Sequence, residues 1–338
     1  MKFIQIPVFF VLISLTGPIL AEEKKEEAKK TQPASKTEAA KKEQAQNKQE
    51  PKKKETPKKP EPPKKKPAPK KKETAKKEEP PKKKPPPKKP PPIFEDKKLE
   101  SVVRRHVFAK RNNNEPLNSE DVRHVSSIKG RNLGIKNLKG LEHCRELASI
   151  ELADNEIVDL SPLKELERLQ LIDLAGNKVR DLSPLGELGI LQYLNLENNQ
   201  VSSLKTLETV PSLRSLYLSG NQVTDLRPLS GLTKLWSLYL GDNKIRDISP
   251  LKALSHLDIL DLRNNQVTNV SPIAGHRAFR MLFLQGNKVS NLGPLLANVK
   301  KDAAGRREFS PFLRVWLKGN PVPKGQVTEL KKLVKEVQ

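Results

Sequence analysis

Seven asparagines recur at a constant interval of 22 residues, and they constrain the fold more than any other feature of this sequence. They are Asn155, Asn177, Asn199, Asn221, Asn243, Asn265 and Asn287. A fixed period of roughly 20 to 50 residues is the signature of a solenoid, in which each repeat packs only against its neighbours. The chain therefore predicts a stack of similar coils.

Apolar residues stand at fixed distances on both sides of each asparagine. Around Asn221 they are Leu213, Leu216 and Leu218 before it and Val223, Leu226 and Leu229 after it. Alternation of apolar and other residues before the asparagine predicts a short strand with one buried face. Because every unit repeats that strand, the strands are expected to lie side by side and parallel in one continuous sheet.

Each unit reads LxxLxLxxNxIxDLSPLxxLxx, which resembles the leucine-rich repeat. The Asp159–Leu163 and Asp181–Leu185 segments are similar to the short bacterial subtype found in internalins. The resemblance covers roughly residues 99–323. It implies an α/β solenoid with a curved parallel sheet on the concave face, short helical turns on the convex face, and helical caps.

The turns and the ends of the stack also have sequence signals. Gly-Asn pairs such as Gly220-Asn221 suit the turn after each strand, and the asparagines are expected to form a structural ladder that bonds the backbone of neighbouring coils. Ser-Pro pairs such as Ser161-Pro162 fit a hydroxyl cap with proline at the first helical position. Cys144 and His276 interrupt one apolar column and are interpreted as structural residues.

The two ends depart from the repeat, as the caps of a solenoid should. At the N-terminal end, apolar residues from Leu99 to Val107 predict an amphipathic helix, Asn118 begins a second helix, and Leu133 replaces the asparagine of a degenerate unit. At the C-terminal end, Asn320 follows Asn287 after 33 residues. The extra residues at 297–308 are expected to be helical, followed by a strand at 315–317 and a helix at 328–337.

The N-terminal quarter of the chain predicts export and a tether. Residues 1–21 have the layout of a secretory signal, with retention as a membrane anchor as the alternative. Residues 22–92 hold 26 lysines against 12 glutamates, out of a formal net charge of +24 for the chain, and they contain no aromatic or branched aliphatic residue. Such a segment cannot bury enough apolar surface to fold, so a disordered Lys/Pro/Glu-rich tether is expected.

The predicted domains follow from these observations. They are a signal peptide (1–21), a disordered tether (22–92), an N-terminal helical cap with a degenerate repeat (93–146), leucine-rich repeats (147–323) and a C-terminal capping helix (324–338).

Candidate partner-binding residues lie where the strands point away from the core. They are Tyr193, Tyr217, Tyr239, Asp261, Arg263, Met281, Phe283 and Trp316. Although only 4% of the residues are aromatic, all three tyrosines fall on this predicted face. Exposed aromatic residues are typical anchors of protein interfaces. Phe283 and Trp316 have an alternative role, which is to cover the junction with the C-terminal cap.

The sequence predicts a non-catalytic scaffold that recognises a protein or peptide on its concave face. No nucleophile elbow, phosphate loop, metal-ligand spacing or cofactor motif occurs, so we expect no enzyme activity, metal or cofactor. The neighbouring carboxylates Glu151 and Asp173 are the only catalytic alternative that the pattern offers. A lysine tract without aromatic interleaving argues against a specific nucleic-acid ligand.

Three further expectations complete this interpretation. The protein is expected to be monomeric and exported to the periplasm, cell surface or extracellular space of a bacterium. In the alternative, the tether is the main functional part of the chain, either as a spacer or as a polycation that attracts anionic envelope polymers or lipids.

Overall fold

The computed structural model describes residues 92–338 of the chain. The predicted signal peptide (1–21) and the predicted tether, apart from its last residue, lie outside the described residues.

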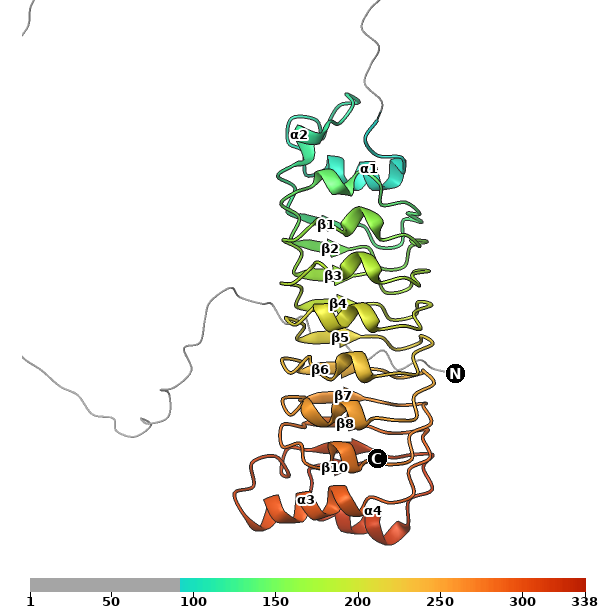
Figure 1. Ribbon diagram of the computed structural model, residues 1–338, viewed down its shortest axis with the longest axis vertical. Helices are drawn as coiled ribbons and strands as arrows, with labels where there is room; N and C mark the ends of the chain where they lie inside the picture. The colour runs from blue at the N-terminus through green and yellow to red at the C-terminus, as the bar shows by residue number, and fades with distance from the viewer. Residues whose placement is uncertain (1–91) are drawn as a thin grey trace, which may run out of the picture. The chain divides into compact units, whose positions relative to one another are not determined.

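Ten short strands form one parallel sheet in which the spatial order of the strands is their order in the chain (Figure 1). They are β1 (Ser127–Lys129), β2 (Ser149–Glu151), β3 (Leu171–Asp173), β4 (Tyr193–Asn195), β5 (Ser215–Tyr217), β6 (Ser237–Tyr239), β7 (Ile259–Asp261), β8 (Met281–Phe283), β9 (Arg314–Trp316) and β10 (Glu336–Val337). From β1 to β8 each residue is paired with the residue 22 positions later, as between Leu216 and Leu238. The predicted solenoid is therefore confirmed.

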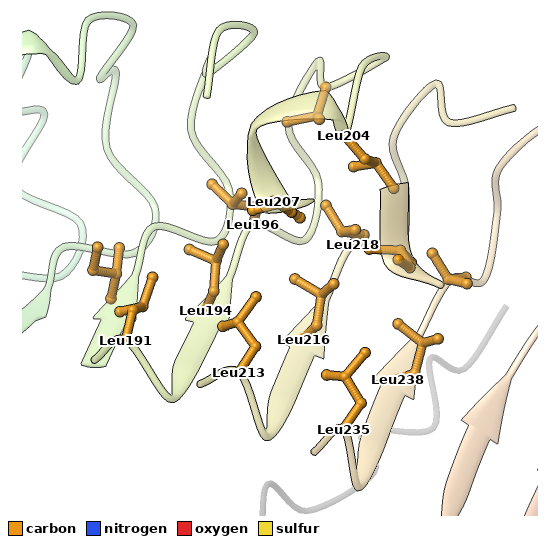
Figure 2. Packing of buried hydrophobic residues seen from close by; sticks show 14 of the residues in the cluster. Leu191, Leu194, Leu196, Leu204, Leu207, Leu213, Leu216, Leu218, Leu235 and Leu238 are labelled. Carbon is orange, nitrogen blue, oxygen red and sulfur yellow. The ribbon is translucent and has the colours of Figure 1, made fainter. Parts of the chain in front are cut away.

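The core is a set of columns in which one residue type stacks along the sheet. Figure 2 shows Leu194, Leu216 and Leu238 in one column, beside a second column formed by Leu191, Leu213 and Leu235. All six side chains are inaccessible to solvent. Because every coil presents an apolar residue at the same position, burial of each apolar face requires a neighbouring coil on either side.

Short 3₁₀ turns return the chain on the side opposite the sheet. They are η1 (Leu141–His143), η2 (Ser161–Leu163), η3 (Ser183–Leu185), η4 (Lys205–Thr209), η5 (Arg227–Leu229), η6 (Ser249–Ala253) and η7 (Ser271–Ile273). The predicted capping by serine is wrong in detail, since Ser161 is the first residue inside its turn and its hydroxyl caps nothing. Instead Asp159 Oδ1 accepts hydrogen bonds from the Ser161 backbone N–H at 2.9 Å and from its hydroxyl at 2.6 Å.

The predicted asparagine ladder lies between the strands and these return turns. At Asn221 the amide Nδ2 donates to the carbonyls of Leu218 in the same coil, at 2.9 Å, and of Leu196 in the preceding coil, at 2.8 Å. Its Oδ1 accepts the backbone N–H of Val201 at 2.9 Å. The same contacts recur along the ladder, where each asparagine is at most 8% exposed. The side chain thus pairs backbone groups that three-residue strands leave without a partner.

The residue before each ladder asparagine has a left-handed backbone. At Gly220 φ is +71°, whereas Asn198 and Asp242 occupy the equivalent position in the adjacent coils with φ of +54° and +55°. A side chain built on Gly220 would overlap the Asn198 side-chain oxygen. Asparagine and aspartate tolerate this conformation, and glycine at position 220 also leaves room for the close approach of the Asn198 side chain.

The N-terminal cap contains the two predicted helices, but the first ends at Arg104, so Val107 is buried beyond it rather than within it. Helix α1 (Lys97–Arg104) buries Leu99, Val102 and Val103, and helix α2 (Ser119–Val122) begins with a reciprocal capping box between Asn118 and Asp121. The degenerate unit lacks its own ladder residue. Asn155 of the next coil nevertheless accepts the backbone N–H groups of Leu133 and Ile135, which completes the first rung.

Cys144 and His276 fill the apolar column that the sequence assigned to them. Cys144 is fully buried, and this burial raises the pKa of its thiol to about 12. The ring nitrogens of His276 lie 3.1 Å from the carbonyl oxygens of Ile273 and Leu251. Both residues are therefore integrated into the core.

The C-terminal cap differs from its prediction in the bounds of its helices and in an additional strand. Helix α3 (Gly293–Ala304) begins at the position of a return turn, four residues before the predicted start, and it lies beside helix α4 (Lys324–Lys331) at the end of the stack (Figure 1). The predicted capping helix ends at Lys331 rather than Val337, because β10 (Glu336–Val337) adds to the sheet beside β9.

None of the helices within residues 92–338 could span a membrane.

The ladder makes a prediction about stability. Replacing Asn221 by alanine leaves the buried Val201 N–H without a partner, whereas the Leu196 carbonyl keeps the hydrogen bond from Asn199 Nδ2. We expect Asn221→Ala to lower the free energy of unfolding by about 1–3 kcal/mol in urea denaturation. Gln222→Ala, which truncates an exposed neighbour, is the control and should change it by less than about 0.5 kcal/mol. Equal effects of both substitutions would contradict the role of the ladder.

Candidate partner-binding surface

One column of side chains projects from the last residue of each strand from β1 to β9, on the face opposite the core, and we call this surface the sheet face. In chain order the column contains Lys129, Glu151, Asp173, Asn195, Tyr217, Tyr239, Asp261, Phe283 and Trp316. The strand register makes each of these residues the lateral neighbour of the next, as the sequence predicted. Residues two positions before or after this column flank it on the same face.

Tyr193, Tyr217 and Tyr239 form a continuous aromatic stack, which we call the tyrosine ladder. The ring centroids of Tyr217 and Tyr239 are 4.6 Å apart and nearly parallel, and the Tyr193 ring lies 5.2 Å from Tyr217 with a tilt of 41°. All three side chains are partly exposed. Burial is the main cause that raises the pKa of each phenol, so the hydroxyls are neutral donors at pH 7.

Carboxylates lie beside the tyrosine ladder. Burial raises the pKa of Asp173 and Glu197 above the ordinary values. Asp173 Oδ1 accepts the Ala175 backbone N–H at 3.2 Å, and no cation within residues 92–338 forms an ion pair with Asp173 or Glu197. The ladder is thus flanked by two half-buried carboxylates without an ion-pair partner in the described residues, and Arg263 and Arg131 only partly offset the effect of burial on their pKa values.

Glu151 and Asp173 are lateral neighbours, as predicted. However, Lys129 Nζ lies 2.9 Å from Glu151 Oε1 and forms a salt bridge with it. Glu151 is therefore ion-paired, whereas the neighbouring Asp173 accepts a hydrogen bond from a backbone N–H. Within residues 92–338, no group of three or more His, Cys, Asp or Glu side chains is placed to bind a metal ion.

Asp261 and Arg263 have different exposures. We predicted both as partner-binding residues, but Asp261 is only 1% exposed. Its Oδ1 accepts the Arg263 backbone N–H at 2.9 Å, and its Oδ2 lies 2.7 Å from Arg263 Nη2. Asp261 is therefore covered by the arginine and orients it, while Arg263 retains 28% side-chain exposure and can contact a partner.

The C-terminal end of the sheet face is formed by Met281, Phe283 and Trp316. Phe283 is 9% exposed and stacks on Trp316, with a centroid distance of 4.2 Å. The Trp316 indole N–H donates to Gln338 Oε1 at 2.7 Å. This arrangement favours the alternative role of these two rings, the covering of the cap junction, whereas Met281 remains partly exposed beside them.

Sequence reasoning missed a second group of aromatic residues at the N-terminal ends of the strands. Trp236 is 55% exposed and Phe312 is 56% exposed. Two signals could have indicated them. Trp236 stands at a position where the adjacent repeats have Arg214 and Asp258, and Phe312 lies between the extra residues of the 33-residue interval and the last predicted strand.

Comparisons with known proteins agree with this architecture. The family described as "Leucine Rich repeats (2 copies)" matches residues 191–231, 211–253 and 233–275. The crystal structure of internalin C2 from Listeria monocytogenes is 31% identical, with a TM-score of 0.58, over 60% of this chain and 89% of that chain. The chain therefore belongs to the leucine-rich-repeat family, and its 22-residue repeat is of the internalin-like type.

Two more distant structures share the fold. The functional domain of InlJ from Listeria monocytogenes is 19% identical with a TM-score of 0.52, covering 71% of this chain and 54% of that chain. The leucine-rich-repeat ectodomain of a plant membrane receptor kinase from Arabidopsis thaliana is 21% identical with a TM-score of 0.53, covering 65% of this chain and 28% of that chain. No curated protein matched.

The raised pKa of Asp173 predicts a dependence of stability on pH. Because the native state disfavours the carboxylate, wild-type stability decreases as pH rises from the ordinary aspartate value through the raised native value. Asn195 accepts the equivalent backbone N–H in the next coil, so Asp173→Asn preserves this contact. We expect Asp173→Asn to be more stable than wild type at pH 7 and equally stable below the ordinary aspartate pKa, as measured by urea denaturation across pH.

Asp181 provides a control of opposite sign. Its pKa is lowered, chiefly by the hydrogen bond from the Ser183 hydroxyl, so its carboxylate stabilises the fold above the ordinary pKa and loses this effect as pH falls. Asp181→Asn should therefore be less stable than wild type at pH 7, and the difference should disappear in acid. Changes in the free energy of unfolding at pH 7 that have the same sign for both variants would contradict the opposite pKa shifts assigned to Asp173 and Asp181.

Proposed function

We propose that this protein is a non-catalytic scaffold that binds a protein or peptide partner on its sheet face, with the tyrosine ladder as the main anchor. One observation carries the proposal: all three tyrosines of the chain are stacked on adjacent strands and remain partly exposed. Tyrosine rings that served only packing would be buried in the core, and a surface that contacts only solvent does not require aromatic residues.

The geometry of the tyrosine ladder suits recognition. Stacking fixes the side chains before a partner arrives, so binding sacrifices little conformational entropy. Each ring offers apolar area together with a neutral hydroxyl that can donate a hydrogen bond, a combination that makes tyrosine frequent among residues that dominate binding energy.

The charges around the tyrosine ladder indicate the partner's chemistry. Asp173 and Glu197 are half-buried carboxylates without an ion pair in the described part of the chain. A lysine or arginine of the partner would offset their burial and could rest on the face of a tyrosine ring. Arg263, held by Asp261, supplies a positive contact at the C-terminal side of the tyrosines.

The comparisons are consistent with a binding role. The Arabidopsis ectodomain, which shares the fold, was crystallised in complex with Casparian strip integrity factor 2. For this chain we infer a monomer, exported by residues 1–21 to the cell surface, periplasm or extracellular space of a bacterium.

The lysine surplus of residues 22–92 supports a second candidate function, in which the chain is an envelope-associated spacer or polycation. Attraction of a lysine tract to anionic polymers or lipids weakens steeply with salt. Anchoring through the sheet face buries aromatic surface and is less sensitive to salt. The two functions are therefore separable by ionic strength.

The test is capture of partners from envelope extracts of the producing cells, over a range of salt concentrations. We expect Tyr217→Ala combined with Tyr239→Ala to abolish the salt-resistant capture that wild type shows, because loss of two anchors of this kind commonly weakens binding by about 100-fold or more. Deletion of residues 22–92 should remove only the capture that salt disrupts.

A matched control replaces Val158 and Ile190 by alanine. These side chains are 53% and 45% exposed and lie outside the sheet face, so they test the loss of exposed apolar area as such. Undiminished salt-resistant capture by the tyrosine variant would contradict the proposal. Loss of all capture on removal of residues 22–92 would favour the polycation instead.

A further inference from the structure

A groove of about 650 Å³ lies along the N-terminal ends of strands β5–β8, apart from the sheet face. One wall is a row of residues that each precede a strand: Arg214, Trp236, Asp258 and Arg280. Backbone hydrogen bonds make these residues consecutive neighbours. The Trp236 N–H donates to the Arg214 carbonyl at 2.8 Å, and the Asp258 N–H donates to the Trp236 carbonyl at 2.9 Å. The solenoid therefore fixes the order and spacing of this wall.

The opposite wall is supplied by the segment that follows α3. Asp302 holds this segment in place, because its carboxylate accepts the backbone N–H groups of Glu308, at 2.9 Å, and Ser310, at 2.8 Å. Phe309 is 3% exposed, whereas Phe312 projects with 56% exposure. The additional residues of the 33-residue interval thus build a wall that the other coils lack.

The groove has an aromatic lining with open rims. Phe279 is 1% exposed and stacks on His276 at 5.0 Å, so it forms part of the fixed core beneath the groove. Trp236, in the row that precedes the strands, and Phe312, in the segment after α3, by contrast expose more than half of their surface. The volume is within the range of about 300–1,000 Å³ that is typical of ligand pockets. A large apolar side chain between the two rims would bury both rings.

Positive charge predominates around the groove. Four cationic residues line it against two carboxylates: Arg214, Lys234, Arg277 and Arg280 against Asp258 and Glu308. The carboxylates are already engaged, since Asp258 lies 3.4 Å from Arg280 and Glu308 lies 3.8 Å from Arg277. No carboxylate within residues 92–338 forms an ion pair with Arg214 or Lys234.

We propose that this groove binds an acidic peptide segment of a protein partner, with one large apolar or aromatic side chain of that segment inserted between Trp236 and Phe312. Carboxylates of the segment meet Arg214 and Lys234, which lie at the Trp236 end of the groove. A desolvated aromatic anchor supplies affinity, and the complementary charges select the partner and speed association. The lysine-rich residues 22–92 have the wrong charge for this groove. The proposal is independent of the tyrosine ladder, which uses other side chains.

The two tryptophans of the chain provide a local readout in the full-length protein. In a tryptophan-labelled sample, nuclear magnetic resonance shows one indole N–H signal for Trp236 and one for Trp316, whose indole is bonded to Gln338. The probe is the synthetic peptide Ac-Glu-Asp-Trp-Glu-Asp-NH2, unlabelled. We expect a saturable shift of the Trp236 signal and an unchanged Trp316 signal. Attraction of the peptide to residues 22–92 moves neither signal.

Two pairs of variants test the contacts. Arg214→Glu combined with Lys234→Glu should weaken binding of the peptide by about tenfold or more. The control, Lys244→Glu with Lys288→Glu, makes the same change of charge outside the groove and should have little effect on binding. Phe312→Ala should also weaken binding by about tenfold, against Phe108→Ala, which removes an 81% exposed ring from the N-terminal cap.

Control peptides complete the test. Replacement of the central tryptophan by alanine should abolish the shift, and so should replacement of the four acidic residues by lysine. The proposal is overturned if the acidic peptide does not move the Trp236 signal, if both indole signals move together, or if the lysine peptide moves the Trp236 signal as strongly. None of these results bears on capture by the tyrosine ladder.

Discussion

The asparagine side chain between neighbouring coils is the interaction on which the rest of the structure depends. A strand of three residues offers few ladder hydrogen bonds, and the chain must then turn inside the protein, where backbone groups have no access to water. Each asparagine solves this problem with one amide, because Nδ2 donates to carbonyls of two coils and Oδ1 accepts a backbone N–H of the preceding coil. The leucine columns fill the interior, but they would not by themselves fix the register between coils.

This division of roles leaves the outward positions free to vary. Strands β4–β6 carry the tyrosines on the sheet face, and the row from Arg214 to Arg280 lies at the N-terminal ends of β5–β8. Neither set of residues is required to build the core, since leucines and asparagines do that in every coil. A solenoid can therefore present two chemically different surfaces on one rigid frame, an aromatic and acidic one and an aromatic and basic one.

Much of this architecture could be predicted from the sequence because successive repeats carry the same pattern of apolar residues and asparagine. The buried columns, the parallel order of the strands and the tyrosine ladder follow from positions relative to Asn221 and its equivalents. Non-repeating features were harder to predict. Residues 328–337 have a helical pattern, yet pairing with β9 draws Glu336–Val337 into the sheet. Asp261 was expected on the surface because its position projects outward, but the long side chain of Arg263 folds over it. The groove escaped notice because one of its walls comes from residues 305–312, whose position depends on contacts with Asp302 that no periodicity encodes.

Amide hydrogen exchange of the interior coils tests the central claim most directly. If asparagine side chains hold the coils in register, the backbone N–H groups of Val201, Val223 and Ile245, which donate to them, exchange only when neighbouring coils open together. Their protection should then equal that of strand amides such as Leu216. Exchange of these three amides that is faster by orders of magnitude than exchange of the strand amides would show that the turns open independently, and would contradict the account.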